Sequence, residues 1–437
     1  MKAIKRNLFG SVALSLSILL TACGGGSETS ADPDGQSDTP DESTDNEEVV
    51  EITYSSGYDA TGTIQEILDA FMEQNPNIKV EYQEMPADTG AQHDQYVTAL
   101  SSQSSEVDVF AVDVIWPAEF AQAGYGLELD RFIERDDIDM NEYFPGTAQA
   151  GNVNGRQFAM PTFTDAGLLY YRSDIIDEAP STWDELIEMA SEFQGVEGTD
   201  FGYLLQSNQY EGLVVNATEF IAAYGGEVID ENGDVTINSP EAIKGIEKLA
   251  EIVQSDFVPG DILRFTEVET ANNFTQGRSI FARNWPYMQS MANGEESEVA
   301  GKVDFAMLPS GDAGSASGLG GWMTMINRYS ENPEAAWELV KFLTGPEGQK
   351  INAIHGNRAP TLEALYEDEE VREASSMFAN EEFVETLQNA VPRPITPIYP
   401  VISDIMQIEL SRVLAGESTP EEAVVSMEEK MNAAIAE

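Results

Sequence analysis

The chain has 437 residues, of which 78 are acidic and 22 are basic, so its formal net charge at pH 7 is −56. This charge repels nucleic acid and anionic lipid surfaces, and we expect no nucleic-acid partner and no direct binding to lipid headgroups. The single cysteine, Cys23, excludes an intramolecular disulfide and any cysteine-based zinc site.

Residues 1–22 have the layout of a signal peptide. The positive charges of this segment are Lys2, Lys5 and Arg6. The apolar run 8–20 that follows is too short to span a bilayer as a stable helix. Leu-Thr-Ala-Cys at residues 20–23 resembles the bacterial lipobox, which implies that the Cys23 thiol is acylated and becomes the new N-terminus. The alternative is a buried or reactive free thiol at this position.

Residues 23–50 are expected to form a disordered acidic tether. From Gly24 onward they are mostly Gly, Ser, Thr, Asp, Glu and Pro, with no Lys or Arg. Such a segment buries too little apolar surface to offset its ordering entropy, and its end-to-end distance would be roughly 30 Å. With Cys23 lipidated, the folded body would lie outside the cytoplasm, anchored to the membrane by lipid alone.

The acidic residues are spread along the whole chain, which favours a solvated surface adapted to concentrated salt over a dedicated cation-binding or cation-transport role. Removal of the signal peptide would take away three positive charges and leave a net charge of −59. The Debye length is about 10 Å at 0.1 M ionic strength and about 3 Å at 1 M. The melting temperature should therefore rise as sodium chloride increases over this range. A flat profile would instead indicate local ion pairs or cation sites.

After the tether, strands and helices are expected to alternate. Short strands are predicted at 51–54, 78–82 and 107–114, and helical segments at 63–72 and 94–101. Thr63 with Glu66 has the spacing of a capping box at the start of the first helix. The alternation predicts βαβ units, an α/β fold and a mostly parallel sheet. Residues 51–437 exceed what one hydrophobic core usually supports, so two domains are expected.

Further helix starts are marked by a capping residue, followed in most cases by proline. They are Thr182 with Glu185, Ser239-Pro240, Asn332-Pro333 and Thr419-Pro420. Residues 227–237, with Asn232-Gly233 at the centre, are predicted to form a hairpin.

Several kinds of chemistry are not expected. The two histidines, His93 and His355, have no acidic or cysteine neighbours at metal-ligand spacing, so we expect no metal site. The glycines at 318–321 lack the full dinucleotide-binding spacing and are interpreted as a turn. Residues 230–234 lack the terminal glutamate of a calcium loop, which favours a hairpin turn. No cofactor is expected.

The remaining signal is a set of aromatic residues beside glycines, prolines and acids at the ends of predicted elements. In open α/β sheets such positions converge beyond the carboxyl ends of strands. A sugar suits this chemistry, because its C–H faces stack on aromatic rings and its hydroxyls pair with planar carboxylate and guanidinium groups. The segments are Asp113–Pro117, Pro161–Tyr171, Arg283–Tyr287, Gly320–Trp322 and Arg393–Tyr399.

The chain from about residue 50 to 437 resembles family 1 extracellular solute-binding proteins, the maltose-binding group, and within it the trehalose/maltose type. The segments that carry the resemblance are 111–116, 165–172, 182–186, 284–287, 320–322, 335–343 with 345–348, and 393–399. The family also binds oligosaccharides, glycerol phosphates and other solutes.

The resemblance implies two α/β lobes, joined by a hinge that the chain crosses more than once, with a ligand cleft between them. The first lobe would comprise 51–161 and 288–343, and the second 162–287 and 344–437. By position, Asp113 and Asp165 would accept hydrogen bonds from hydroxyls. Trp285 and Trp322 would be stacking platforms. The remaining implied ligand contacts are Trp116, a backbone contact at Gly321, Arg393 as a donor across the cleft, and Arg358 as a second donor.

Near Tyr58 the family adds an acid, for which Asp59 and Glu66 are both candidates. The function implied is capture of a sugar by a monomer, without catalysis, and its delivery to the permease of an ABC importer. A non-sugar solute in the same cleft is one alternative. A glycoside hydrolase is another, because carboxylates with aromatic platforms also build such enzymes. A structural or adhesive surface lipoprotein is a third.

Overall fold

The computed structural model of the chain describes residues 49–59, 61–86, 89–230, 232–436. The predicted signal peptide, Cys23 and nearly all of the predicted tether lie outside the described residues. In the described part of the chain, no helix is both long enough and apolar enough to cross a membrane.

The first sheet has the strand order β2-β1-β3-β11-β6. Its strands are β1 (Val50–Ser56), β2 (Ile78–Glu84), β3 (Val109–Asp113), β6 (Ala159–Ala166) and β11 (Leu319–Ile326). The three strands predicted first are confirmed, and β1 is parallel to both β2 and β3. Strand β11 is antiparallel to β3 and β6. The sheet is therefore mixed, and the prediction of a mostly parallel sheet is wrong, because β11 enters from a distant part of the chain.

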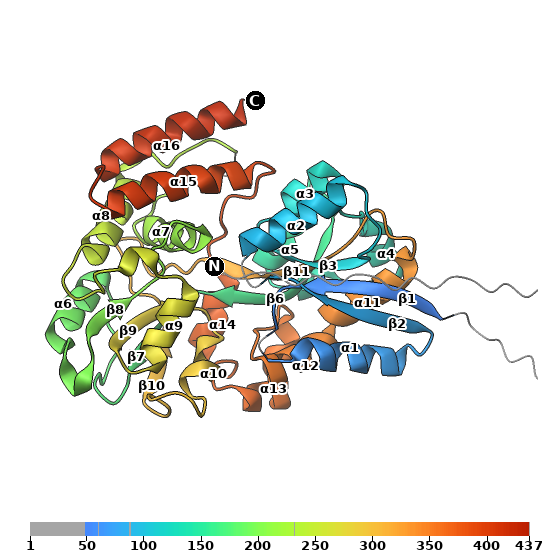
Figure 1. Cartoon of the computed structure of the whole chain (residues 1–437), viewed down its shortest axis with the longest axis horizontal. Helices are drawn as coiled ribbons and strands as arrows, with labels where there is room; N and C mark the ends of the chain where they lie inside the picture. The colour runs from blue at the N-terminus through green and yellow to red at the C-terminus, as the bar shows by residue number, and fades with distance from the viewer. Residues whose placement is uncertain (1–48, 60, 87–88, 231, 437) are drawn as a thin grey trace, which may run out of the picture. The chain divides into compact units, whose positions relative to one another are not determined.

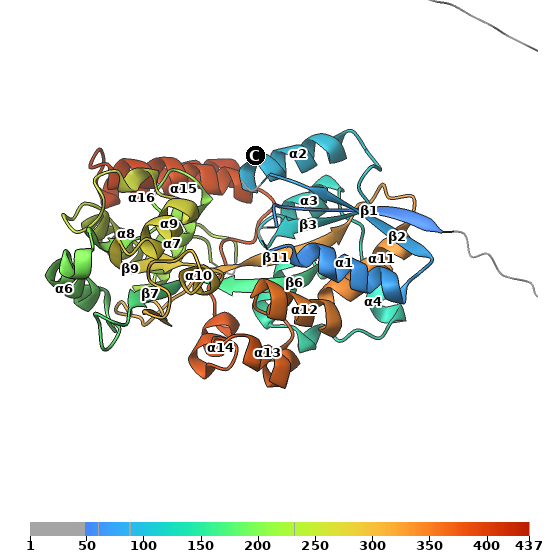
Figure 2. The same ribbon diagram turned by 60° about the horizontal axis from the view of Figure 1, so that its bottom comes forward.

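Both faces of the first sheet are covered by helices, as the alternation along β3 shows. Val109 and Ala111 belong to a core with α1 (Thr63–Gln74) and α11 (Pro333–Thr344). Phe110 and Val112 belong to a core with α2 (Thr89–Ser101) and α3 (Pro117–Ala123). Successive side chains of a strand point to opposite faces, so a continuous apolar run such as β3 implies burial on both sides. Figures 1 and 2 show these helices on opposite sides of the sheet.

The second sheet has the order β10-β7-β9-β8 and is also mixed. Its strands are β7 (Leu168–Arg172), β8 (Phe201–Leu204), β9 (Ser279–Asn284) and β10 (Val303–Ala306). Helices α7 (Glu211–Ala223), α8 (Pro240–Val253), α15 (Tyr399–Leu414) and α16 (Pro420–Ile435) pack on one another beside it (Figure 1). Apolar residues of these strands and helices form the largest buried cluster of the described residues.

The other elements are short or peripheral. They are α4 (Asp130–Arg135), α5 (Pro145–Ala150), the two-stranded pair β4 (Asn152–Val153) and β5 (Arg156–Gln157), α6 (Trp183–Phe193), α9 (Glu267–Thr275), α10 (Met288–Ala292), α12 (Pro346–Gly356), α13 (Glu369–Ala374) and α14 (Glu381–Gln388).

The positions at which the chain passes from one sheet to the other differ from the predicted lobe boundaries. It leaves the first sheet between β6 and β7, around Gly167, rather than at 161. It stays with the second sheet beyond 288, because β10 pairs with β7, and it returns only at β11. Helix α12 packs on α1 and α11, so the chain remains with the first sheet beyond 343.

The helix starts were predicted with mixed success. The side chains of Thr182, Ser239 and Thr419 accept capping hydrogen bonds, as expected. The capping box of Thr63 with Glu66 is wrong, because the N-cap is Gly62 and the Asp59 carboxylate accepts from the Ile64 N–H at 2.8 Å. Asn332 is an N-cap residue without a side-chain capping bond. At 227–237 a single bridge joins Ile229 to Val235, and no named strand flanks the turn among the described residues.

Candidate functional site

Three neighbouring strands of the first sheet bring predicted site residues into one row. In the ladder, Trp322 on β11 is paired with Asp113 at the end of β3 and with Phe163 on β6. Paired residues on adjacent strands point to the same face of a sheet. The Trp322 and Asp113 side chains are both partly exposed, so this row presents an indole ring and a carboxylate next to one another.

Trp116 lies behind this row and is only 4% exposed. Its ring meets the Trp322 ring edge to face, with centroids 5.6 Å apart, and stacks on Phe120 at 6.0 Å. Sequence reasoning proposed Trp116 as a ligand contact, but in this structure it supports the Trp322 ring from the core side.

Arg393 lies between two carboxylates, one at the end of β3 in the first sheet and one at the start of α7 beside the second sheet. Its Nη2 donates to Asp113 Oδ1 at 3.2 Å, and its Nη1 donates to Glu211 Oε1 at 2.7 Å. The Arg393 side chain is 3% exposed. Glu211 also accepts hydrogen bonds from the hydroxyls of Tyr399 and Ser403. Because Glu211 opens α7, the helix N-terminus adds to the stabilisation of its negative charge. The ion pairs of Arg393 thus connect β3 with α7, and the hydrogen bonds of Glu211 connect α7 with α15.

Asp165 on β6 is paired with Gly320 on β11, two positions along from Trp322. Its carboxylate is partly exposed, and none of the described residues donates a hydrogen bond to it. Burial raises the pKa of Asp165 to about 7, the Asp113 charge adds to this effect, and the charges of Arg358 and Arg283 oppose it. Gly321 is buried, with φ of +114°, and its carbonyl accepts from the Val114 N–H at 3.3 Å. A carboxylate without a partner at this point can accept hydrogen bonds from a ligand.

Arg358 reaches the same region from the turn after α12. Its guanidinium carbon lies 5.0 Å from the centre of the Phe163 ring, and its Nη2 is 3.4 Å from Asp59 Oδ1. Asp59 in turn caps α1, whereas Glu66 pairs with His355 at 3.1 Å on an exposed surface. Of the two acids considered near Tyr58, Asp59 is therefore the one connected to the predicted site residues.

Trp285 comes from the second sheet, directly after β9, and its ring lies against β11 of the first. A Cβ atom added to Gly320 would lie 2.8 Å from Trp285 Cζ3, so only glycine permits this approach. The Arg283 guanidinium carbon is 4.1 Å from the ring centre, and Trp285 Nε1 is 3.4 Å from Glu267 Oε1. The partly exposed indole of Trp285 is thus held beside the Asp165 strand pair.

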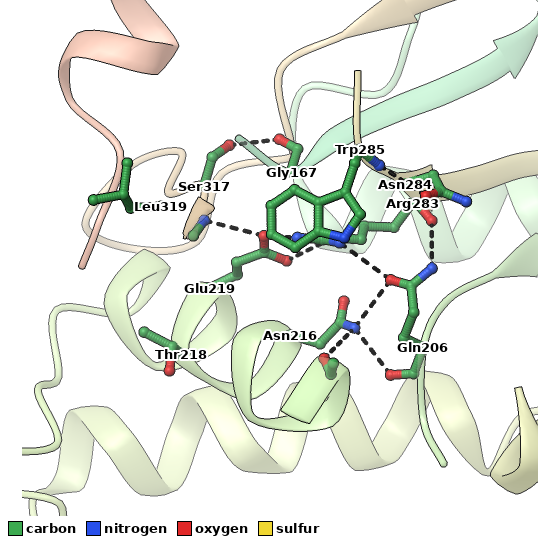
Figure 3. A network of polar contacts seen from close by, with 12 residues as sticks. Gly167, Gln206, Asn216, Thr218, Glu219, Arg283, Asn284, Trp285, Ser317 and Leu319 are labelled. Carbon is green, nitrogen blue, oxygen red and sulfur yellow. Dashed lines mark hydrogen bonds and ion pairs between the residues drawn. The ribbon is translucent and has the colours of Figure 1, made fainter. Parts of the chain in front are cut away.

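Beneath Trp285 lies a buried polar network, drawn in Figure 3. Arg283 and Glu219 form an ion pair in which both side chains are 1% exposed. Arg283 Nη1 also donates to Gln206 Oε1 at 3.2 Å, and Asn216 Nδ2 donates to the same oxygen at 3.2 Å. Burial raises the pKa of Glu219, and the Arg283 charge opposes this effect. Each charged group in this network is hydrogen-bonded, as burial requires.

Sequence reasoning missed Glu211 and Glu219, and it included Arg283 only as the first residue of the segment 283–287, without a role of its own. A local signal was present for two of these residues: Glu219 directly precedes apolar residues of the buried helix α7, and Arg283 directly follows the apolar run 280–282 of β9. A charge inside an apolar element requires a partner, and these two are each other's. Glu211 had no comparable local signal. Within the described ranges, no group of three or more His, Cys, Asp or Glu side chains is arranged to hold a metal ion.

Comparison with known proteins agrees with this architecture. Residues 55–350 match the family model of the bacterial extracellular solute-binding proteins. A relative from Deinococcus radiodurans, named a probable ABC transporter-binding protein, is 34% identical over 374 residues, which are 82% of this chain and 87% of the relative.

Solved structures agree as well. Maltose-bound MalE3 of T. maritima has a TM-score of 0.82 and 38% identity, covering 88% of this chain and 100% of that one. A solute-binding protein of Thermotoga lettingae, bound with α-D-tagatose, has a TM-score of 0.79 and 26% identity, covering 88% and 99%.

These similarities confirm the two-lobed α/β fold that the resemblance implied, with one lobe around each sheet. They also set aside the hydrolase alternative, because the matching proteins are binding components of transporters rather than enzymes. The chain belongs to the bacterial extracellular solute-binding protein family.

Proposed function

We propose that the protein captures a sugar outside the cytoplasmic membrane, as a monomer, and delivers it to the permease of an ABC importer. A glucose-containing disaccharide, trehalose or maltose, is the first candidate ligand. The ligand would lie where the two sheets meet, between Trp322 and Asp113 on one side and Trp285 on the other. A non-sugar solute at the same place is the alternative.

The observation that carries the proposal is the Asp165 carboxylate, which receives no hydrogen bond from the described residues and lies between two partly exposed indole rings. Asp165 is paired in the sheet with Gly320, which the Trp285 ring touches, and Trp322 lies two residues further along β11. Aromatic rings offer apolar surface to the C–H faces of a sugar, and a free carboxylate accepts hydrogen bonds from two hydroxyls. The maltose in MalE3 and the tagatose in the Thermotoga lettingae protein support a sugar as the class of ligand.

A thermal-shift screen tests the class of ligand. Mono- and disaccharides, polyamines, peptides and phosphate esters are added at low and at molar salt. A ligand at a thousand times its dissociation constant adds about 4 kcal/mol to the free energy of unfolding, which should raise the melting temperature by several degrees. Maltose or trehalose should give such a shift. If only a polyamine, peptide or phosphate ester does, the ligand is not a sugar.

The pH dependence of sugar binding should depend on Asp165. A hydroxyl that donates to this carboxylate favours its ionised form, whereas in the free protein its pKa is about 7. Below that pH, binding must first remove a proton, so affinity should rise as the pH rises towards 7 and level off above it. Asp165→Asn should weaken binding and abolish this dependence, because the amide does not titrate and accepts hydrogen bonds at only one of its two positions. Titrations from pH 5 to 8 measure both effects. An equal slope in wild type and variant would contradict the assignment.

We further propose that Cys23 carries lipid and holds the protein at the membrane. The support is the sequence at 20–23 and the acidic segment behind it. Cys23→Ser should release the protein into the medium or leave an uncleaved precursor, as judged by fractionation and intact mass. Unchanged membrane retention together with an unchanged mass would contradict lipidation.

A further inference from the structure

We propose that Arg283 is a positioning residue for sugar binding, which holds the Trp285 ring and, through Glu219, joins that ring to both neighbouring connections between the sheets. The inference rests on the proposed function. It concerns side chains too buried to touch a ligand themselves.

The ion pair is the starting observation. Arg283 Nε donates to Glu219 Oε2 at 3.0 Å, and Arg283 Nη2 donates to Glu219 Oε1. Both side chains are 1% exposed. A buried ion pair is often no more stabilising than apolar side chains of similar volume, so stability alone does not explain why charges occupy this site. Its position in the fold is therefore the informative feature.

Both neighbouring chain connections contact this ion pair. Gly318, just before β11, donates its N–H to Glu219 Oε1 at 3.0 Å. Gly167, between β6 and β7, lies so close that an added Cβ atom would be 2.5 Å from Arg283 Nη2. Ser317 Oγ donates to the Gly167 carbonyl at 2.8 Å, which joins the two connections to one another. Figure 3 shows Gly167 and Ser317 near the Glu219 carboxylate, with the bond between them as a dashed line.

The Arg283 guanidinium also lies against the ring of Trp285, the proposed stacking platform for the sugar. The Arg283 guanidinium carbon lies 4.1 Å from the centre of the Trp285 ring. Its plane is set by Glu219 on one edge and by Gln206 Oε1 on the other, and Gln206 Nε2 returns a bond to the Arg283 carbonyl at 3.0 Å. A planar group held in this way fixes the ring above it, which a lysine ammonium cannot do to the same extent.

The consequence is a connection between ligand contact and lobe movement. Lobes of binding proteins close through small backbone changes at the segments that join them. Here those segments, at Gly167 and Gly318, touch the same ion pair that supports Trp285. A shift of the connections should therefore move the ring, and a sugar stacked on the ring should favour one arrangement of the connections.

Arg283→Lys tests the inference, because it retains a positive charge for Glu219 but loses the planar contact with Trp285. Maltose affinity should fall about tenfold, the range expected for a desolvated cation–π contact. The double variant with Trp285→Leu should bind no more weakly than Trp285→Leu alone, since Arg283 acts through that ring. Without sugar, Arg283→Lys should also increase the quenching of tryptophan emission by acrylamide.

Arg172→Lys is the matched control. Arg172 is likewise buried, with a side chain 5% exposed, and pairs with Asp174 through two bonds of 2.7 Å. Arg172 is the last residue of β7, whereas Gly167 directly precedes the first residue of that strand. The two positions are therefore at opposite ends of β7. This variant should be less stable than the wild type, yet its maltose affinity and acrylamide quenching should be unchanged.

The outcomes distinguish the ring-holding role of Arg283 from the identity of the sugar ligand. If acrylamide quenching is the same in Arg283→Lys and Arg172→Lys, Arg283 does not hold the ring and the inference fails. Equal maltose affinity in wild type and Arg283→Lys, or a fully multiplicative loss in the double variant, overturns it as well. If the wild type binds neither maltose nor trehalose while quenching changes as expected, the proposed ligand fails and the ring-holding role of Arg283 stands.

Discussion

Trp322→Ala should weaken maltose binding by at least about 2 kcal/mol, or roughly 30-fold. The indole is partly exposed, stands on Trp116 and adjoins Asp113 in the sheet. Its removal would take away stacking area and leave the edge of Trp116 to face water. Calorimetric titration measures the loss.

The control for this prediction is Trp337→Phe. Trp337 is a tryptophan of the same lobe, fully buried against Phe132, and its Nε1 donates to Asp136 at 2.8 Å. Its replacement should lower the melting temperature and leave the affinity unchanged. If Trp322→Ala binds the sugar as the wild type does, the site is wrongly placed.

Arg283→Met should destabilise the fold by about 3–5 kcal/mol, because it leaves the Glu219 carboxylate buried without its cation. Gly318 N–H would remain its only hydrogen-bond donor among the contacts described above. Without the arginine, only the Gly318 N–H and the Arg393 charge would oppose the effect of burial on the pKa of Glu219, so this pKa should rise further. The loss should therefore be smaller at acid pH, where the carboxyl is protonated, and grow as the pH rises. Denaturant titration at several pH values gives the free energy of unfolding.

Two further variants make this result interpretable. Arg278→Met breaks an ion pair with Asp200 in which both side chains are about half exposed, and it should cost less than about 1 kcal/mol. Adding Glu219→Gln to Arg283→Met should recover part of the lost stability, since neither of these two positions then carries a buried charge. A loss in Arg283→Met no greater than in Arg278→Met would show that the pair carries little energetic weight.

Local patterns in the sequence were sufficient for much of the fold. The strands β1 and β2 follow from alternating apolar and polar residues, and β3 follows from a short apolar run. Helices α6, α8 and α16 follow from capping residues at their starts. These features depend on interactions within a few residues, which is why they can be read from one sequence.

Long-range features were predicted less well. Strand β11 joins β3 and β6 across more than 150 residues of chain, and nothing local indicates that it runs antiparallel to both. The same applies to β10, whose pairing with β7 corrects the predicted lobe boundary. The Thr63 capping box failed because Asp59, outside the usual spacing, takes the capping role.

The candidate site shows the same division. The resemblance pointed to Asp113, Asp165, Trp285, Trp322 and Arg393. In the structure Asp113 is joined to Trp322 by a sheet pair and to Arg393 by an ion pair, and Asp165 and Trp285 both lie next to Gly320. The resemblance could not show that Arg393 is held by Glu211, since the two residues are 182 positions apart. Nor could the resemblance show that Trp116 is covered by Trp322, because each ring lies beside a proline or a glycine in the sequence and either could face a ligand.

Equilibrium dialysis with labelled maltose and trehalose, followed by chromatography of the recovered sugar, tests the central claim most directly. The protein is used at a concentration comparable to that of the sugar, at molar salt and pH 8. We predict saturable binding of one sugar per chain, and recovery of that sugar as the intact disaccharide. Absence of saturable binding of either sugar, or release of glucose in proportion to the protein, would contradict the account.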